Sequence, residues 1–524
     1  MIEKAAGHAR DWRWPLRALS NFVFTRGFVV GLALVAEAGF FWWLTTRSFN
    51  LTLNFYLVSV LFSLVMVVRL VSSRTHPSYQ LAWAIFMLAL PPTGALVYLL
   101  RCLMDLLPAR RNRRLEQEKI LVRYLQQNPK TWQVVQKLPS RARAVMFYLS
   151  KMENFPVYQQ TQTEFLPLGE VFFERLKEKL RTAKKFIFLE YYIISDGVMW
   201  SEILDILHQK VVEGVEVRVM YDDVGSLFTL PTNYVQTLAQ YGIKARVLNR
   251  FRPWLLFQMN NRDHRKIAVI DGQTGFVSGV NLADEYINVT HQHGHWKDTG
   301  VCLTGVAVDT LTVLFLQFWH QFDKTEHDWS EYLPVHPDKV DNDGLIVPFA
   351  DDPHDHETVA KNVYLDLINR ARRQIFLTTP YLVPDNELIT ALTLAAKNGV
   401  EVNLITPGIG DHFFVQMLTE SFYYQLMEAG VRIFEYTPGF IHSKTLCVDG
   451  ELAVVGTINL DFRSLYLLYE CGVLAYGAQM CQQLAADVAA TVKVSRQVQI
   501  RDVSEIHWVT RVMRSLLRLV APLF

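Results

Sequence analysis

The sequence predicts an α/β fold made of two similar repeats, related by a pseudo-twofold axis and preceded by N-terminal transmembrane helices. Three observations support this prediction. Long apolar runs crowd the first hundred residues, short strand-like runs alternate with amphipathic stretches further on, and that succession occurs twice.

Three stretches in the N-terminal region are uncharged or nearly so: residues 27–46, with Glu37 alone, 51–68 and 78–100. Each is long enough to cross a hydrocarbon core about 30 Å thick at ~1.5 Å of rise per helical residue. We therefore expect residues 1–108 to form a membrane region with two or three hydrophobic helices. Glu37 and the pair Pro91-Pro92 could keep one segment from spanning.

Basic residues near these runs give conflicting signals about orientation. A basic cluster follows the third run, namely Arg110, Arg111, Arg113 and Arg114, and it predicts that the downstream chain is cytoplasmic. The N-terminal arm is also basic and is therefore predicted to be cytoplasmic as well. Three crossings cannot satisfy both signals. We give more weight to the denser downstream cluster, and expect a multi-pass protein whose catalytic domain is cytoplasmic.

Composition narrows the class of protein. Half of the 524 residues are hydrophobic and only 20% are charged, which is unlike a disordered chain. Fifty-two basic against 51 acidic residues give a net charge of +1, so no global field favours a nucleic acid partner. The five scattered cysteines show no disulfide or zinc spacing and are expected to be buried in a reducing compartment.

The soluble part divides into strands and helices that recur. Runs such as 185–193, 215–221 and 266–270 are rich in β-branched and aromatic residues, and amphipathic stretches such as 199–212 separate them. The segment from Ala183 matches the one from Ala371, and Gly214-Val-Glu-Val matches Gly399-Val-Glu-Val. We expect a basic helical linker at 109–150, a first repeat at 151–335 and a second at 336–524.

Each repeat contains one copy of a motif, H-x-K-x4-D. Its members are His264, Lys266 and Asp271 in the first repeat and His442, Lys444 and Asp449 in the second. An asparagine and then an acidic residue follow each copy, namely Asn281 and Asp298, and Asn459 and Glu470. Two copies in register argue against a chance match.

These residue types suit chemistry on a phosphodiester. On a strand, the histidine and lysine of H-x-K point to the same face, so two repeats meeting at a twofold would bring two imidazoles and two ammonium groups together. Lysines and asparagines can hold the non-bridging oxygens. One imidazole can then attack phosphorus while the other protonates the departing alkoxide.

Acidic residues complete the expected site. A histidine used in this way needs a carboxylate on its second nitrogen, and Asp298 and Glu470 occupy equivalent positions for this task. We expect both to border the substrate together with Asn281 and Asn459. Each motif aspartate precedes a glycine, as in a hairpin turn, so a structural role is favoured over a chemical one although both stay among the candidate catalytic residues.

The duplicated motif resembles that of the phospholipase D superfamily, and the linking segments resemble those of bacterial cardiolipin synthases. These segments are Leu189-Glu190-Tyr191-Tyr192, Tyr221-Asp222-Asp223, Trp296-Lys-Asp298-Thr299, Thr379-Pro380-Tyr381, Tyr436-Thr-Pro438-Gly439-Phe440-Ile-His442 and Gly456-Thr-Ile-Asn459-Leu-Asp461-Phe-Arg463-Ser464. One departure is Ser278-Gly279, where the superfamily more often has Gly followed by Ser or Gly.

The resemblance implies two phospholipase D-type α/β/α sandwich repeats in a bacterial plasma membrane enzyme. Such an enzyme converts two phosphatidylglycerols into cardiolipin and glycerol through a phosphohistidine, with no metal and no cofactor. His264 would be the nucleophile and His442 the acid and base. A phospholipase D that passes the phosphatidyl group to water, and a binding protein without turnover, remain alternatives. The expected partners are phosphatidylglycerol and anionic membrane lipid, with no nucleic acid, and the sequence leaves a homo-oligomer open.

The C-terminal segment, about 505–524, is expected to form an amphipathic helix. His507, Arg511, Arg514 and Arg518 share one face, and apolar residues occupy much of the rest. The pattern fits an interfacial helix that binds anionic lipid, and it equally fits a helix packed against the protein.

Overall fold

The computed structural model describes most of the chain. The described residues are 26–73, 75–105, 119–231, 233–250, 260–321, 323, 327–336, 343–354 and 357–523. They fall into two compact units, the helices before residue 106 and the described residues from 119 onward. The basic N-terminal arm up to Arg17 and the arginine run 110–114 lie outside the described residues.

The described residues of the first unit form four helices, α2 (Arg26–Arg47), α3 (Phe49–Val71), α4 (Pro77–Ala89) and α5 (Pro91–Asp105). Among the described residues, α3 is the helix whose length and apolar composition suffice to cross a membrane. The third apolar run does not form one helix. It divides at Leu90, which leaves helical geometry at φ −128° and ψ 71°, because Pro91 cannot continue the backbone hydrogen bonds of α4.

The second unit holds two sheet-containing halves. The first half comprises β1 (Thr161–Leu166), α9 (Gly169–Thr182), β2 (Phe186–Tyr191), α10 (Val198–Val212), β3 (Glu216–Asp222), α11 (Tyr234–Gln240), β4 (Lys244–Leu248), β5 (Ile267–Ile270), β6 (Thr274–Ser278), β7 (His295–Lys297), β8 (Gly300–Gly305) and α12 (Val308–Trp319).

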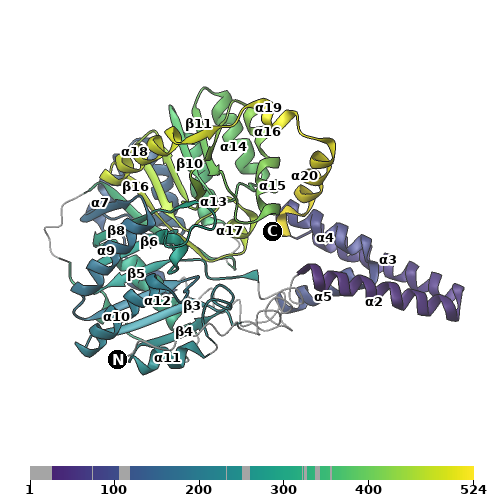
Figure 1. The fold of residues 1–524 in the computed structure, drawn as a ribbon, viewed down its shortest axis with the longest axis horizontal. Helices are drawn as coiled ribbons and strands as arrows, with labels where there is room; N and C mark the ends of the chain where they lie inside the picture. Colours follow the sequence, from purple (N-terminus) through teal and green to yellow (C-terminus); the bar gives the residue numbers. More distant parts are fainter. Residues whose placement is uncertain are drawn as a thin grey trace. The chain divides into compact units, whose positions relative to one another are not determined.

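The second half repeats this succession. It comprises β9 (Leu345–Asp351), α13 (Val359–Arg370), β10 (Gln374–Thr378), α14 (Asn386–Lys397), β11 (Glu401–Pro407), α15 (Phe413–Ser421), α16 (Tyr423–Glu428), β12 (Arg432–Tyr436), β13 (Gly439–Ile441), β14 (Thr445–Val448), β15 (Leu452–Gly456), α17 (Phe462–Tyr466), β16 (Glu470–Tyr476), α18 (Gln479–Lys493), β17 (Ser495–Gln497), α19 (Ile500–Ser504) and α20 (Trp508–Val520). Figure 1 follows both halves along the chain.

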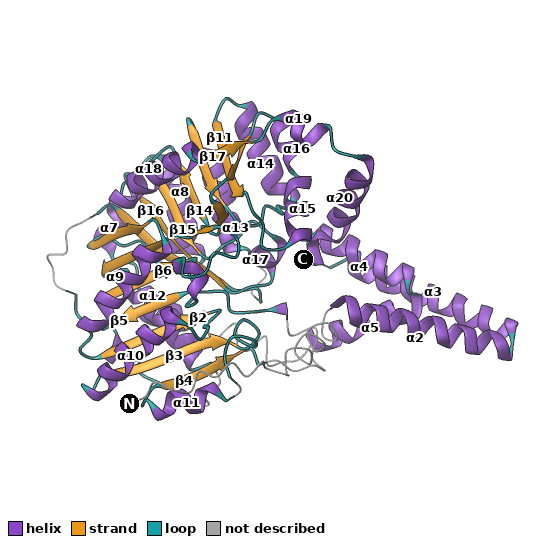
Figure 2. Cartoon of the chain, in the orientation of Figure 1, coloured by secondary structure: helices purple, strands orange, loops and turns teal. Residues whose placement is uncertain are grey.

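The two sheets have the same strand order, which confirms the predicted duplication. The first runs β1-β8-β6-β5-β2-β3-β4, and the second runs β9-β16-β15-β14-β10-β11-β12 with β17 added at its edge. In each sheet the three strands β2, β3 and β4, or β10, β11 and β12, are parallel, and the remaining pairs are antiparallel. Figure 2 shows both sheets with helices packed around them.

Burial on both faces explains why the central strands read as continuous apolar runs. All six residues of β2 are buried. Helices α9 and α10 contribute to the core on one side of the first sheet. On the other side, Phe315 of α12 stacks on Phe188 of β2 with ring centroids 4.5 Å apart. Such two-sided cover favours unbroken β-branched and aromatic sequences over alternating ones.

The residues between the membrane region and the first sheet form part of the second unit. Helices α7 (Pro129–Gln136) and α8 (Ser140–Phe147) lie here. The guanidinium of Arg141 in α8 pairs with Asp449, at 3.1 Å, and with Glu451 of the second half. The described part of the expected basic linker is therefore helical and is anchored to the second repeat.

Candidate active site

The histidine and lysine of each motif immediately precede a central strand. His264 and Lys266 come just before β5, and His442 and Lys444 lie between β13 and β14. The sequence predicted these residues to be on the strand itself, so their position differs by a few residues. The histidines are 8% and 6% exposed, whereas the lysines are 1% and 0% exposed. All four side chains are therefore buried, and the imidazoles are slightly more accessible than the ammonium groups.

Two short parallel backbone pairings join the halves at the motifs. Strand β13 pairs with β7, with Ile441 opposite Lys297, so the next residues along each chain, His442 and Asp298, emerge side by side. The same arrangement recurs where Asp263 bridges Tyr469 in parallel, and there the next residues are His264 and Glu470. Inter-half pairing thus determines which carboxylate meets which histidine.

Each histidine is held by the acid of the other half. His264 Nδ1 lies 2.9 and 3.0 Å from the two carboxylate oxygens of Glu470. His442 Nδ1 lies 2.6 Å from Asp298 Oδ2. A carboxylate at Nδ1 favours the proton on that nitrogen and leaves Nε2 with a free lone pair.

The two acids are supported differently, although they occupy equivalent positions. The hydroxyls of Thr457 and Ser464 both donate to Glu470. Asp298 accepts from the backbone N–H of Thr299 at 2.8 Å. The residue equivalent to Thr457 is Gly279, where a Cβ would overlap the Asp298 carboxylate, so the Ser278-Gly279 departure lets that acid approach closely.

Aromatic rings border the histidines unequally. Tyr192 lies edge-on to His264 with centroids 5.2 Å apart. His442 has three aromatic neighbours, Tyr286, Trp296 and Phe440, with centroids 5.4, 5.3 and 5.8 Å from its ring. The electron-rich faces and oxygen of such a shell can stabilise a cation at its centre.

Burial and the lysines keep the imidazoles neutral. Desolvation lowers the pKa of both His264 and His442 well below 6.5, and the ammonium groups of Lys266 and Lys444 lower each pKa further. Each lysine therefore acts on both histidines, which brings all four motif side chains into one electrostatic site. A neutral imidazole is the form that can act as a nucleophile or base.

The lysines and acids carry perturbed pKa values for the same reason. Burial lowers the pKa of Lys266 to about 8 and of Lys444 to about 7, and it raises the pKa of Glu470 to about 8 and of Asp298 to about 7. Lys266 Nζ donates to the backbone carbonyl of His264 at 2.6 Å, and Lys444 Nζ donates to that of His442. An ammonium carries three protons, so two on each remain for an anionic ligand.

The two asparagines differ in their contacts. Asn281 Oδ1 accepts from the backbone N–H of Ile193 at 3.0 Å, and its Nδ2 donates to the Tyr286 hydroxyl at 2.6 Å. It therefore holds Tyr286 against His442. Asn459 Oδ1 is buried and has no hydrogen-bond partner within the described part of the chain, so this amide is available to a ligand or a water.

The motif aspartates lie at the other ends of their strands, and the structure gives them backbone partners. Asp271 and Gly272 both have positive φ, +53° and +67°, as a two-residue hairpin turn requires, and Asp449 and Gly450 have +57° and +71°. The Asp271 carboxylate accepts from the amides of residues 184–186, and Asp449 from those of 372–374. These contacts hold the loops before β2 and β10 and agree with the structural role that the sequence favoured, while a catalytic role for the two aspartates stays an untested prediction.

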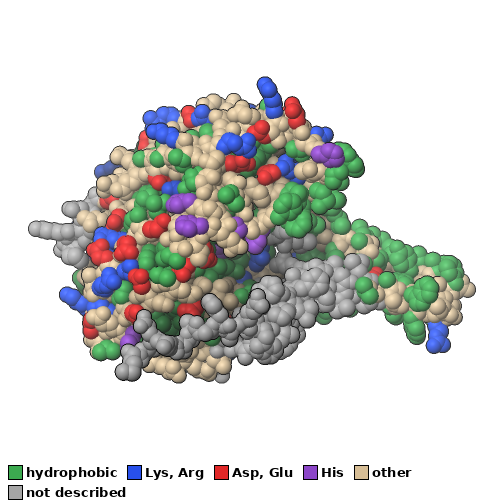
Figure 3. Space-filling model, in the orientation of Figure 1, with side chains coloured by type: hydrophobic (Ala, Val, Ile, Leu, Met, Phe, Trp, Pro, Cys, Tyr) green, Lys and Arg blue, Asp and Glu red, His purple; other side chains and the backbone are tan. Residues whose placement is uncertain are grey.

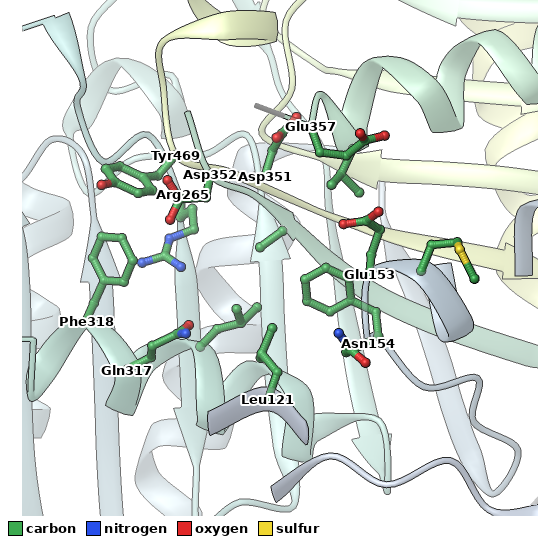
Figure 4. Close-up of a pocket in the computed structure, with 15 residues that line it drawn as sticks. Leu121, Glu153, Asn154, Arg265, Gln317, Phe318, Asp351, Asp352, Glu357 and Tyr469 are labelled. Carbon is green, nitrogen blue, oxygen red and sulfur yellow. The ribbon is translucent and has the colours of Figure 1, made fainter. Parts of the chain in front are cut away.

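A cavity of about 290 Å³ lies beside the site. Arg265 and Tyr469 line it, as Figure 4 shows, and each is the chain neighbour of a site residue. Arg265 pairs with Glu190 at 2.5 Å and with Asp263 at 3.1 Å, and it lies over the Phe318 ring. Neither histidine lines this cavity, so it is separate from the paired histidines.

Within the described part of the second unit, one group of side chains could coordinate a metal ion: the ligand atoms of His320, Asp323 and His327 lie within 4.8 Å of one another. Asp323 already pairs with the Arg246 guanidinium at 3.1 Å, and His320 Nδ1 contacts it at 2.7 Å. None of these residues belongs to the two motifs.

Four side chains that support the site were not singled out from the sequence. Thr457 and Ser464, which hold Glu470, and Tyr286 and Phe440, which border His442, were not among the candidates. Thr457 and Ser464 lie in the segment from Gly456 to Ser464, and Phe440 lies in the segment from Tyr436 to His442. Both segments are among those that carry the family resemblance, so closeness to the motif was the signal that could have identified these three residues.

Comparison with known proteins agrees with this geometry. The family model described as "Cardiolipin synthase, PLD-like domain" matches residues 176–296 and 364–491, one segment in each half. A cardiolipin synthase of Halalkalibacterium halodurans is 32% identical over 466 residues, which cover 86% of this chain and 89% of the relative. Cardiolipin synthase 2 of Bacillus anthracis is 34% identical over 454 residues, with 86% and 87% covered.

A phosphatidylserine synthase of Haemophilus influenzae with a crystal structure superimposes with a TM-score of 0.55 at 17% identity, over 72% of this chain and 97% of that one, and so shares the fold. Two halves with one strand order, a motif copy in each, and identities above 30% across most of the chain lead to one conclusion: the chain belongs to the phospholipase D-like family of cardiolipin synthases.

Proposed function

We propose that this protein is a cardiolipin synthase, which transfers a phosphatidyl group from one phosphatidylglycerol to another and releases glycerol. The observation that carries the proposal is the pair of crossed histidine–carboxylate contacts, with two buried lysines acting on both imidazoles. A neutral imidazole for attack, a second imidazole for proton transfer and two cationic groups match the needs of phosphodiester exchange.

In the first half-reaction, the phosphodiester anion lies between Lys266 and Lys444, whose free ammonium protons bind its non-bridging oxygens. His264 Nε2 attacks phosphorus, and the bond from phosphorus to the glycerol oxygen breaks. The bound anion offsets the lysine charges that lower the pKa of His442, so His442 takes up a proton from solvent and enters this step as an imidazolium, with Nδ1–H on Asp298. Its Nε2–H then donates to the glycerol oxygen, so glycerol leaves as a neutral alcohol and His442 becomes neutral. The product on the enzyme is a phosphatidyl-histidine, with the proton on His264 Nδ1 facing Glu470.

In the second half-reaction, a second phosphatidylglycerol takes the place of glycerol. His442, now neutral, accepts the proton of its terminal hydroxyl, and that oxygen attacks phosphorus. The bond between phosphorus and His264 Nε2 breaks, which yields cardiolipin and the original protonation states. One phosphodiester is exchanged for another, so no nucleotide is required.

The assignment of roles to the two histidines rests on their surroundings. The acid and base must carry a positive charge in part of the cycle, and His442 lies among three aromatic rings that can stabilise an imidazolium. The nucleophile must keep one orientation, and Glu470 contacts His264 with both oxygens while two hydroxyls hold that carboxylate. This supports His264 as nucleophile.

A reconstitution experiment tests the activity. The purified chain would be placed in phosphatidylglycerol vesicles, and cardiolipin, phosphatidic acid and free glycerol would be quantified beside His264→Ala and His442→Ala controls. Cardiolipin with an equal amount of glycerol, absent from both controls, is expected. Phosphatidic acid without cardiolipin would instead make the protein a hydrolase, and no control-sensitive product would refute the proposal.

A second experiment separates the two roles. Phosphatidyl-p-nitrophenol has a leaving group that departs without a proton, so it does not require the acid. His442→Ala should release about one equivalent of p-nitrophenol and accumulate an acid-labile phosphatidyl-histidine, whereas His264→Ala should do neither. The opposite pattern would exchange the roles.

The topology completes the proposal. Residues 1–108 form the membrane region of a multi-pass plasma membrane protein, 109–150 connect it to the repeats at 151–335 and 336–524, and the catalytic part is cytoplasmic. Support comes from α3 and from the arginine pattern of the sequence. Protease treatment of intact spheroplasts and of inverted vesicles should cleave the catalytic part in the inverted vesicles alone, and cleavage in spheroplasts would overturn the orientation.

A further inference from the structure

The C-terminal helix α20 presents its apolar face outward. Trp508, Val509, Val512, Leu516, Leu519 and Val520 lie along one side of the helix, and all of them are exposed. Trp508 is 68% and Leu516 is 55% exposed. A helix of a water-soluble domain normally turns such a stripe toward the core. Figure 3 shows apolar side chains gathered over α15 and α20.

Polar contacts of the opposite face fix this orientation. Arg514 pairs with Glu420 of α15, and Arg518 donates to Gln425 of α16 at 3.0 Å while its guanidinium lies 4.5 Å from the Phe422 ring centroid. The arginines that the sequence suggested for lipid therefore contact the protein in these two cases. Helix α20 cannot rotate its apolar face inward without breaking both contacts.

The apolar surface continues toward His442. The loop between β11 and α15 and the first turn of α15 expose Ile409, Phe413 and Phe414, the last two at 72% and 53%. Asp411 in the same loop accepts a 2.5 Å hydrogen bond from the Tyr381 hydroxyl. The Tyr381 ring contacts Phe440, which contacts His442, so two aromatic residues connect this loop to the histidine.

The first half has a matching feature at the equivalent place. Strand β3 corresponds to β11, and the loop after β3 exposes Leu227 and Phe228 at 40% and 51%. Gly225 of this loop packs against the backbone of Tyr192, whose ring contacts His264. In each half, aromatic side chains therefore connect the histidine to a loop that exposes apolar side chains.

We propose that these residues, the exposed face of α20 with the loops after β3 and β11, form a docking surface for a bilayer that contains anionic phospholipid. We call them the apolar rim. The rim enters the interfacial layer on both sides of the site, so that two lipid headgroups reach the histidines while their acyl chains stay in the bilayer. Arg501 and Arg511, both exposed beside or within α20, match the negative charge of such lipids. This inference rests on the proposed function for the identity of the substrate.

Contact with lipid can be measured without reference to activity. The full chain would carry Cys102→Ser, since the other four cysteines are buried, and one added cysteine at Leu516, Phe413 or Leu227 labelled with a fluorophore. The control sites are Val212 and Leu394, which are 75% and 50% exposed. They lie near the ends of α10 and α14, which lead into β3 and β11 at the sheet edge opposite the site. In vesicles of phosphatidylcholine and phosphatidylglycerol, doxyl-labelled lipid should quench the three rim positions and leave the two controls unquenched.

Two other outcomes would overturn the proposal. Rim dyes that aqueous iodide quenches as strongly as the control dyes would mean a surface in water. Rim dyes shielded from both quenchers would mean that a second copy or another protein covers the face.

Kinetics provide an independent test. Val512→Ser with Leu516→Ser should lower the rate on vesicle phosphatidylglycerol by about tenfold, because two aliphatic contacts with the bilayer are lost. The same variant should keep its rate on monomeric dihexanoylphosphatidylglycerol, and Val212→Ser with Leu394→Ser should keep both rates. Equal losses on both substrates, or none on vesicles, would refute the rim. A wild-type protein that turns over neither substrate would refute the proposed function, while the quenching result would still decide the rim.

Discussion

The Asp298 carboxylate provides the sharpest test of the crossed histidine pairs. The Asp298→Asn variant keeps the size of the side chain and removes its charge. The group is fully buried, lies 2.6 Å from His442 Nδ1, and also accepts the Thr299 N–H. An amide can replace one of these hydrogen bonds but cannot stabilise an imidazolium by charge.

The magnitude follows from the kind of contact that is lost. A hydrogen bond to a charged group contributes about 1.5–3 kcal/mol, and each ~1.36 kcal/mol changes a rate tenfold. We therefore expect kcat for cardiolipin formation to fall by about 10- to 150-fold. KM should change little, because Asp298 acts through His442 and does not bind the phosphate.

The assay compares two donors. With phosphatidylglycerol, the variant should show the full loss in kcat, whereas release of p-nitrophenol from phosphatidyl-p-nitrophenol should stay near the wild-type burst rate, since that leaving group needs no proton. Glu470→Gln should be slow with both donors, because it weakens the support of the nucleophile. Asp309→Asn is a matched control: Asp309 contacts His336 Nε2 at 2.8 Å and is part of neither motif.

Two results would refute the reasoning. A wild-type kcat for Asp298→Asn on phosphatidylglycerol would mean that the contact with His442 does not take part in the chemistry. Equal losses on both donors would mean that Asp298 supports the nucleophile, and the roles of the two histidines would then be exchanged.

Three further predictions follow from the site. Burial lowers the pKa of Lys444 to about 7, so kcat/KM should decline as pH rises through that value and the ammonium is lost. Lys444→Arg stays charged and should move this decline toward about pH 8, where Lys266 titrates. A decline that stays at the same pH in the variant would contradict this prediction. Asp449→Asn and Asp271→Asn should each lower the free energy of unfolding by about 1–3 kcal/mol, measured as a lower Tm, and should leave kcat per folded molecule unchanged. A catalytic role would instead lower kcat without lowering Tm. Thr457→Val should slow turnover by about 2- to 13-fold through a loosened Glu470, and a change in KM alone would argue against that cause.

The sequence by itself determined the fold class and the duplication, and it predicted ten candidate site residues. Strand-like runs such as the one containing β2, and the two copies of H-x-K-x4-D, are local patterns. Local patterns can be recognised from neighbouring residues alone, without the distant contacts of the fold. Hairpin geometry at Asp271-Gly272 and Asp449-Gly450 was predictable for the same reason. Glu37 and Pro91 marked apolar runs that could fail to span; the third run does divide before Pro91, whereas the run containing Glu37 forms the single helix α2.

Only the tertiary structure decided how the halves combine. Asp298 and Glu470 were recognised as histidine partners, but the crossing of the pairs depends on β7 beside β13 and on Asp263 beside Tyr469, which are more than 140 residues apart in the sequence. Helix α20 was equally compatible with two orientations, because an amphipathic pattern defines two faces and leaves open which one meets the protein. The contacts of Arg514 and Arg518 with α15 and α16 made that choice. The periodicity of a helix or strand depends on neighbouring residues, whereas the register between strands and the orientation of a helix are determined only when distant segments pack.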